Sequence, residues 1–210
     1  MIEKVLVVSL GNPKPYLETF HSAGHLAIQS VQRLIPGQPM WSSQRIGKQK
    51  AQVSMGQKFL LIQSPTLMNV SGGWMAKTFK EVVGTETNKV GFVVLHDDLE
   101  GGLGDVRIRS WKSSHRGHNG LKSINSYLRK EEFPNSYWAR IAIGIGRPEK
   151  RTSDAVSRYV LRPLQQNEKQ ALNEEAPPQV IQLLKDLEEK WAREVKRNAP
   201  SIVKISAPQE

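Results

Sequence analysis

Short apolar runs alternate along the chain with segments in which apolar residues recur every three or four positions. A short unbroken apolar run between turn residues is typical of a strand that is buried on both faces. Such strands are predicted at 5–10, 90–95 and 138–145. Apolar residues at helical spacing predict amphipathic helices. One such helix is expected from Ser22, as its N-cap, to Leu34, and two more are expected at 71–83 and 119–129.

The polar stretch 36–50 is punctuated by proline and glycine, so it is predicted to be a loop that leads to an edge strand. Beyond it, 51–55 and 58–63 flank Gly56-Gln57. Two strand-like segments around such a short turn are typical of a β-hairpin.

Residues 105–109 alternate between apolar and basic side chains. Val106 and Ile108 would lie on one face of a strand, and Arg107 and Arg109 on the other. The basic face of this strand is therefore expected to be solvated and cationic.

The last third of the chain is predicted to be helical. After the start signal Pro177-Pro178, one stripe is formed by Val180, Leu184, Leu187, Trp191 and Val195. We assign this stripe to ordinary core packing. Residues 198–210 show little periodicity and are expected to form a loose tail. The alternation of strands and helices predicts one α/β domain, 1–197, with a mostly parallel sheet and one hairpin edge.

The composition limits the possible chemistry. Of 210 residues, 30 are Lys or Arg and 20 are Asp or Glu, which gives a net charge of +10. This excess favours a polyanionic partner, such as a nucleic acid or a membrane surface, although a basic protein without such a partner would carry the same charge. The chain has no cysteine, which excludes disulfides, thiolate nucleophiles and cysteine-bound zinc.

No apolar run reaches the length of a membrane span. Residues 1–4 lead directly into the first predicted strand and leave no room for a signal peptide or an arginine-rich presequence. We therefore expect a protein that is neither secreted nor embedded in a membrane.

Histidine, carboxylate and amide side chains follow several of the predicted strands. They are Asn12, His21, Asn69, Asp97, His118 and Asn119. If the parallel strands are in register, these side chains converge at one edge of the sheet. A histidine with a carboxylate partner is the minimal unit for activating water, and amides can hold a carbonyl or donate to an oxyanion. No serine has the Gly-x-Ser-x-Gly context, so a covalent acyl-enzyme is not expected.

Each candidate also has a simpler interpretation. His21 could be a surface or capping histidine. Asn69 and Asn119 could cap helices, and Asp97 could accept backbone amides at a strand end.

A metal site is not expected. His96 closes an apolar strand and is interpreted as a packed histidine. His115 and His118 invite a zinc interpretation, but the helical His-x-x-x-His pattern with a nearby glutamate is missing.

The segments that carry these candidates follow one another in a specific order. They are Leu10-Gly11-Asn12-Pro13, Tyr16, His21, Ala23-Gly24, Met68-Asn69-Val70-Ser71-Gly72, His96-Asp97-Asp98-Leu99, Gly117-His118-Asn119-Gly120-Leu121-Lys122 and Ile143-Gly144-Ile145-Gly146-Arg147-Pro148. Together they resemble the bacterial-type peptidyl-tRNA hydrolase family over residues 4–197. The form of 113–120 is more similar to eukaryotic members. This would place the protein in the mitochondrion; otherwise a cytoplasmic location is expected.

The resemblance implies a three-layer α/β/α domain that hydrolyses the ester between a peptide, or an N-blocked amino acid, and the 3′ end of tRNA. The released tRNA would return to translation. No metal or cofactor is implied. His21 would be the general base and Asp97 would orient it. The resemblance also implies active-site asparagines at Asn12, Asn69 and Asn119, and substrate contacts from Tyr16, Met68, Gly117 and His118.

Several positions depart from the family pattern. Phe20 and Ser22 flank the histidine in place of Arg and Asn, and Leu67 replaces a phenylalanine. The family holds the tRNA 5′ phosphate with two cations; Arg109 matches the first, and Ala142 occupies the second position. The cations expected to contact tRNA are Arg107, Arg109, Lys122, Arg140 and Arg147.

We expect a monomer without an obligate protein partner. Two alternative functions remain open from the sequence. One is a non-catalytic RNA-binding module of the same fold. The other is a metal-dependent hydrolase that uses His96, Asp97 and His118.

Overall fold

The structure, a computed structural model, describes residues 2–198. Its centre is a seven-stranded sheet with the order β2-β3-β4-β1-β5-β7-β6. The strands are β1 (Lys4–Ser9), β2 (Ser42–Ile46), β3 (Gln49–Met55), β4 (Phe59–Gln63), β5 (Val90–Asp98), β6 (Val106–Ser110) and β7 (Tyr137–Gly144). The central strands β4, β1, β5 and β7 are parallel, whereas β2, β3 and β6 join through antiparallel pairs. The predicted α/β class is confirmed, with a second antiparallel edge at β6 that was not expected.

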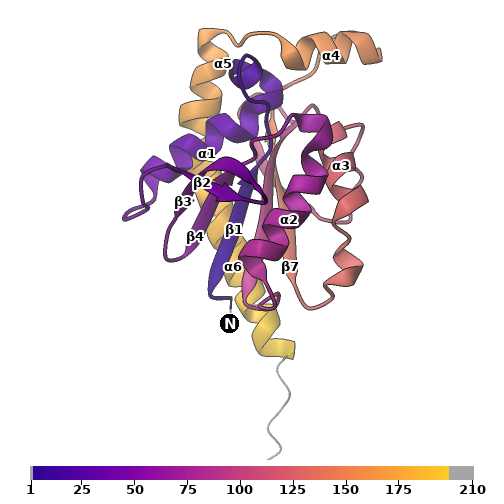
Figure 1. Ribbon diagram of the computed structural model, residues 1–210. Coiled ribbons are helices and arrows are strands. Elements are labelled where there is room, and N and C mark those ends of the chain that lie inside the picture. The colour runs from indigo at the N-terminus through magenta and orange to yellow at the C-terminus, as the bar shows by residue number, and fades with distance from the viewer. Residues whose placement is uncertain (1, 199–210) are drawn as a thin grey trace, which may run out of the picture.

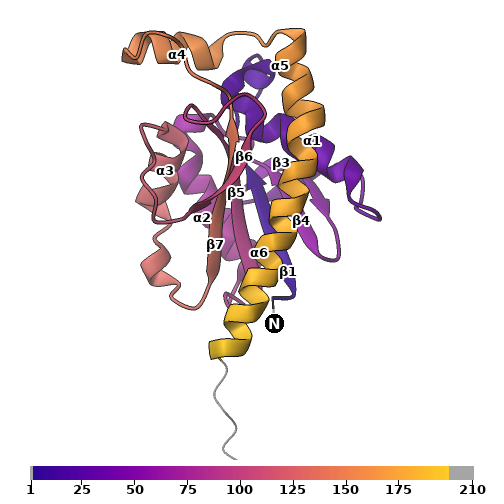
Figure 2. The same cartoon turned by 180° about the vertical axis from the view of Figure 1, so that it is seen from behind.

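Helices cover both faces of the sheet (Figures 1 and 2). They are α1 (Ala23–Leu34), α2 (Ser71–Val83), α3 (Asn119–Tyr127), α4 (Ser153–Leu161), α5 (Gln166–Gln170) and α6 (Ala176–Asn198). Residues of α2 and α3 share one hydrophobic cluster with the sheet, and residues of α1 and α6 share another. Helices α4 and α5 lie beyond the carboxyl ends of the parallel strands. The three layers implied by the resemblance are therefore present.

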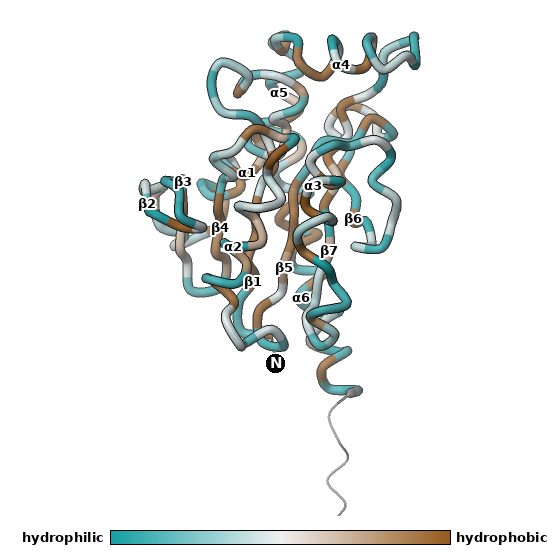
Figure 3. The backbone as a smooth tube through the Cα atoms, turned by 45° about the vertical axis from the view of Figure 1, so that its right-hand side comes forward, coloured by the Kyte–Doolittle hydropathy of each residue, from teal (hydrophilic) through white to brown (hydrophobic). Residues whose placement is uncertain are grey.

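Strand β1 is apolar because both of its faces are covered. Leu6 and Val8 belong to the cluster on the α2 and α3 side, and Val5 and Val7 to the cluster on the α1 and α6 side. All four are fully buried. Figure 3 shows the resulting hydrophobic centre at β1 and β5.

Two predictions about the sheet edges are wrong. The predicted loop 36–50 contains β2, which pairs with β3 and exposes four of its five residues. A strand without a buried face lacks the alternation that would have revealed it. At the other edge, Ile108 is 37% exposed, and the predicted apolar face of β6 is covered only in part.

The last third of the chain is largely helical, as predicted. Helix α5 leads through a π-helical turn, Ala171–Glu175, directly into α6, and Pro177-Pro178 lies in the first turn of α6. The wider turn accommodates prolines that lack an N–H and would crowd the preceding carbonyls. The predicted stripe is confirmed as core, because its members Val180 to Trp191 are buried against the sheet.

The predicted tail, 198–210, lies outside the described residues apart from Asn198, which ends α6. Within residues 2–198, no helix combines the length and the apolar character needed to cross a membrane.

Gly24 allows α1 to start directly against the ends of β1 and β5. A Cβ atom at this position would lie 2.5 Å from the carbonyl oxygen of Leu10 and 2.7 Å from that of Leu95. Because both neighbours are backbone atoms, Gly24→Ala is expected to destabilise the protein by about 1–3 kcal/mol. The midpoint of urea unfolding measures this loss.

The matched control is Gly73→Ala in α2. Its Cβ atom would meet only the ring of Tyr127, at 3.7 Å, which is an ordinary contact. Alanine is favoured over glycine inside a helix by roughly 0.5–1 kcal/mol, so this variant should be no less stable than the parent protein. Equal stability of the two variants would contradict the close packing at Gly24.

Candidate active site

His21 lies in a short 3₁₀ turn, Phe20–Ser22, between β1 and α1. Its two neighbours in the chain are buried and hold the turn in place. Phe20 stacks on Tyr159 of α4 with ring centroids 4.9 Å apart. The Ser22 hydroxyl accepts from the backbone N–H of Asn12 (2.9 Å) and donates to the Tyr16 carbonyl (2.8 Å). Ser22 occupies the predicted N-cap position of α1, but its side chain secures this loop instead of capping the helix.

Asp97 meets His21 at the carboxyl end of β5. The Nδ1 atom of His21 lies 3.0 Å from Oδ2 and 3.2 Å from Oδ1 of Asp97, which is only 4% exposed. An ionised carboxylate can only accept hydrogen bonds, so Nδ1 carries the proton, and in the neutral ring Nε2 keeps its lone pair. This is the tautomer that a general base requires.

The electrostatics of the pair favour an ionised Asp97 and a basic His21. Burial by itself lowers the pKa of His21, but the charge of Asp97 and the hydrogen bond to it raise that pKa above its ordinary value. Burial by itself raises the pKa of Asp97. The facing imidazoles of His21 and His118 more than offset this effect and hold the pKa of Asp97 well below its usual range.

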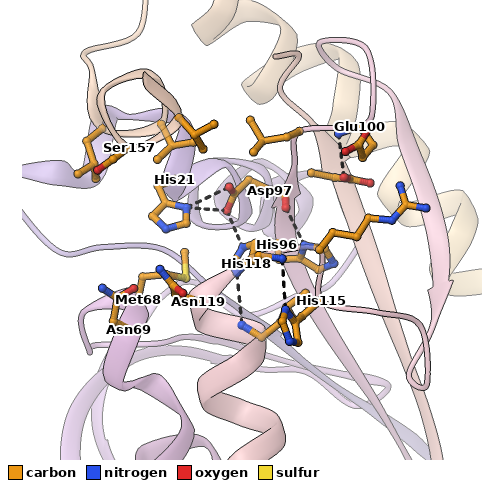
Figure 4. A pocket seen from close by; sticks show the side chains of 18 of the residues that line it. His21, Met68, Asn69, His96, Asp97, Glu100, His115, His118, Asn119 and Ser157 are labelled. Atoms are coloured by element: carbon orange, nitrogen blue, oxygen red, sulfur yellow. Dashed lines mark hydrogen bonds and ion pairs between the residues drawn. The ribbon is translucent and has the colours of Figure 1, made fainter. Parts of the chain in front are cut away.

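His118 contacts the same carboxylate (Figure 4). It is the N-cap residue of α3, where its Nδ1 atom accepts from the backbone N–H of Leu121 (3.3 Å). Its Nε2 atom lies 3.0 Å from Oδ1 of Asp97. The rings of His21 and His118 have centroids 5.2 Å apart. The cap of α3 is thus His118 and not Asn119.

The two neighbours of Asp97 in the chain point elsewhere. His96 is buried, and its Nδ1 atom donates to the main-chain carbonyl of Asp97 (2.7 Å). Burial lowers the pKa of His96 to about 3. Asp98 accepts from Arg109 (3.1 Å). The interpretation of His96 as a packed histidine is confirmed.

The asparagines line the same cleft, whose volume is about 720 Å³. Asn12 is buried, and its side-chain oxygen accepts from the backbone N–H of Met68 (2.9 Å), which ties the first loop to the 3₁₀ turn that precedes α2. Asn69 and Asn119 are exposed at the cleft (Figure 4). The other expected substrate-binding residues, Tyr16, Met68, Gly117 and His118, also line it.

The predicted cations divide into two groups. Arg109, Arg140 and Arg147 line the cleft, whereas Arg107 and Lys122 do not. Arg140 is 2% exposed and donates to the carbonyls of Ser110 (3.0 Å) and Ser113 (2.6 Å), so its guanidinium secures the loop before α3. A phosphate contact is therefore not supported for Arg140.

One wall of the cleft was not expected from the sequence. It comes from α4, through Ser153, Val156, Ser157, Val160 and Leu161, and Arg116 and Arg151 also reach the cleft. The N-cap residue Thr152, whose side chain accepts from Ala155, was a usable sequence signal for this helix.

The ligand atoms of His21, Asp97 and His118 lie within 4.8 Å of one another, a group that could hold a metal ion. This set differs from the one in the metal-dependent alternative, because His96 is directed at a backbone carbonyl. Each of the three groups also takes part in a hydrogen bond within the cluster.

A carboxylate-oriented imidazole in an open cleft, beyond the carboxyl ends of parallel strands, is an arrangement that can activate water for hydrolysis. Fold and site together point to the broad class of hydrolases.

Comparison with known proteins is more specific. The family model for peptidyl-tRNA hydrolase matches residues 6–204. A probable peptidyl-tRNA hydrolase of Schizosaccharomyces pombe is 34% identical over 166 residues, which are 78% of this chain and 73% of the yeast protein. The peptidyl-tRNA hydrolase of Brevibacillus brevis is 34% identical over 194 residues, which are 90% of this chain and 92% of the bacterial protein. The chain belongs to the peptidyl-tRNA hydrolase family.

A solved structure shows the same fold. The peptidyl-tRNA hydrolase from Acinetobacter baumannii matches with a TM-score of 0.65 at 24% identity, covering 89% of this chain and 95% of that one. The family model and the relatives confirm the family resemblance drawn from the motifs.

Proposed function

We propose that this chain hydrolyses the ester bond of peptidyl-tRNA with His21 as general base. The Nε2 atom of His21 takes a proton from water, and the resulting hydroxide attacks the ester carbonyl. When the tetrahedral intermediate collapses, the same proton passes to the departing 3′ oxygen of the tRNA. The observation that carries this proposal is the hydrogen bond from His21 Nδ1 to the buried carboxylate of Asp97 (3.0 Å), which leaves Nε2 as the base.

The amides around the cleft suit the substrate. Asn69 and Asn119 are exposed there and can donate to the ester carbonyl as it becomes an oxyanion. Asn12 is committed to Met68 and would act by holding the wall of the cleft. An ester has a better leaving group than an amide, so a single activated water is sufficient for its hydrolysis.

The basic side chains at the cleft suit the tRNA. Arg109 and Arg147 line it, and the chain carries a net charge of +10. Phosphate contacts by such residues contribute most of the sequence-independent affinity for nucleic acid. Arg107 lies directly across from Ala142 in the pairing of β6 with β7, but it does not line the cleft.

The domain limits, the monomeric state and the compartment stay predictions. The relatives named above include a yeast protein as well as a bacterial one, so they leave both the mitochondrion and the cytoplasm open.

The test is release of an N-blocked amino acid from its tRNA, with and without excess chelator, between pH 5 and 8. We expect turnover that is insensitive to the chelator. Because a general base must be unprotonated and the pKa of His21 is raised, kcat/KM should rise with pH and reach half its maximum above pH 6.5.

Each unfavourable outcome points to a different alternative. No turnover with a competent substrate would favour the non-catalytic RNA-binding module. Loss of activity in chelator would favour a metal ion at His21, Asp97 and His118. A flat pH profile would count against His21 as the base.

A further inference from the structure

We propose that His118 is a positioning residue whose N–H holds the Asp97 carboxylate toward His21 and limits how basic His21 becomes. This inference rests on the proposed role of His21. It departs from the expectation that His118 contacts the substrate. The reason is that both ring nitrogens of His118 are already used inside the protein, and its side chain is only 9% exposed.

The start of α3 determines which nitrogen of His118 carries the proton. The backbone N–H of Leu121 donates to Nδ1 (3.3 Å), so Nδ1 must present a lone pair. In a neutral imidazole the proton is then on Nε2, which lies 3.0 Å from Oδ1 of Asp97. A helix cap therefore selects the tautomer that donates to the carboxylate.

Asp97 consequently shares its charge between two N–H groups from different elements. Oδ2 accepts from His21, and Oδ1 accepts mainly from His118 because the second contact of His21 is longer, at 3.2 Å. Without His118, Oδ1 would lose its shorter hydrogen bond in a site that is 4% exposed. The carboxylate would then be less firmly oriented, and its undivided charge would make His21 more basic.

Other charged groups near the pair are accounted for. The ring of His96 packs edge-on against His118 with centroids 5.2 Å apart. The charge of Arg140 adds to the effect of burial in lowering the pKa of His96. Asp98 is paired with Arg109, and Tyr16 lines the cleft. The charge that raises the pKa of His21 is that of Asp97, so His118 influences His21 through the carboxylate.

Two substitutions separate the two hydrogen bonds of His118. In His118→Asn the side-chain oxygen lies near the position of Nδ1, so it can still cap α3 but cannot reach Asp97. In His118→Gln the amide nitrogen takes the place of Nε2, so it can still donate to Asp97. The side chain then has no acceptor at the position of Nδ1 for the backbone N–H of Leu121. Each variant is therefore the control for the other.

We expect His118→Asn to lower kcat by about 10- to 100-fold at unchanged KM, the loss associated with one hydrogen bond to a charged group. His118→Gln should retain most of kcat. The imidazole titration of His21, followed by NMR, should move upward by about 0.5–1 pH unit in His118→Asn and stay in place in His118→Gln. Thermal melting of both variants verifies that they are folded.

Two outcomes would overturn the proposal. One is wild-type kcat and an unshifted His21 titration in His118→Asn. The other is a similar rise of KM in both variants, which would make His118 a substrate contact. Because the titration of His21 needs no turnover, a failure of the proposed hydrolysis would be distinguished from a failure of this inference.

Discussion

His21→Ala is expected to lower kcat by about 10²–10⁴-fold, while affinity for tRNA alone stays within a few-fold of the parent protein. The general base supplies this range of rate enhancement in other enzymes. His21 is the imidazole whose Nδ1 proton is held by Asp97, which leaves Nε2 to accept the proton of water. Single-turnover release of an N-blocked amino acid measures the loss, and binding of deacylated tRNA measures affinity.

The control for this experiment is Lys185→Ala. Lys185 is exposed on α6 and does not belong to the lining of the cleft, so its removal should leave kcat unchanged. Activity of His21→Ala within a few-fold of the parent protein would reject His21 as base. A parallel loss of tRNA affinity would show that the substitution disturbed more than the chemistry.

Acidification from pH 7 to pH 5 is expected to destabilise the protein by about 4 kcal/mol. Two buried histidines produce the effect. Burial lowers the pKa of His25 to about 4 and that of His96 to about 3. Both values lie below that of the unfolded chain, near ~6.5. Between these values the unfolded state binds more protons, so stability is complete above about pH 6.5 and is lost as the pH falls.

His21 and Asp97 also contribute to the stability, each over a different pH range. The raised pKa of His21 contributes stability that is present at low pH and is lost as the pH rises through it, so it partly opposes the two buried histidines. The lowered pKa of Asp97 contributes stability that is lost only below the unfolded value, near ~3.9. Between pH 7 and 5 the buried histidines therefore dominate.

Urea unfolding at pH 7 and at pH 5 measures this dependence. In His25→Asn the amide oxygen can still accept from the Ser9 hydroxyl, which lies 2.7 Å from His25 Nδ1. The variant should be less stable at pH 7 but lose about half as much on acidification. His115→Gln, at a partly exposed histidine, should keep the full dependence. Equal stability at both pH values would contradict the burial of two neutral histidines.

The sequence was informative wherever the local pattern and the tertiary environment agree. The run Val5 to Leu10 predicted a strand covered on both faces, and β1 is such a strand. The segment 71–83 predicted α2 with its observed limits, because an N-terminal turn and Gly84 bound an amphipathic stripe. Strand β2 was missed because its exposed residues carry no such pattern.

The members of the site could be named from the sequence, but their partners could not. His21 and Asp97 are 76 positions apart, and we expected them to meet because the loops after parallel strands converge at one edge of the sheet. The pairing of β1 with β5 brings the two side chains within hydrogen-bond distance. That Arg140 would be buried against the Ser110 and Ser113 carbonyls had no signal in the sequence. The N-cap Thr152 could have revealed α4, but not that this helix forms a wall of the cleft.

The amino-acid sequence by itself determined the α/β class, the basic charge and the set of polar groups that follow the strands, because hydrophobic periodicity, composition and turn residues are local properties. Only the tertiary structure decided how the protons are distributed among His21, Asp97 and His118. That distribution depends on the two oxygens of one buried carboxylate and on the backbone N–H of Leu121 in the first turn of α3. These groups come from separate segments that meet only when the sheet is assembled.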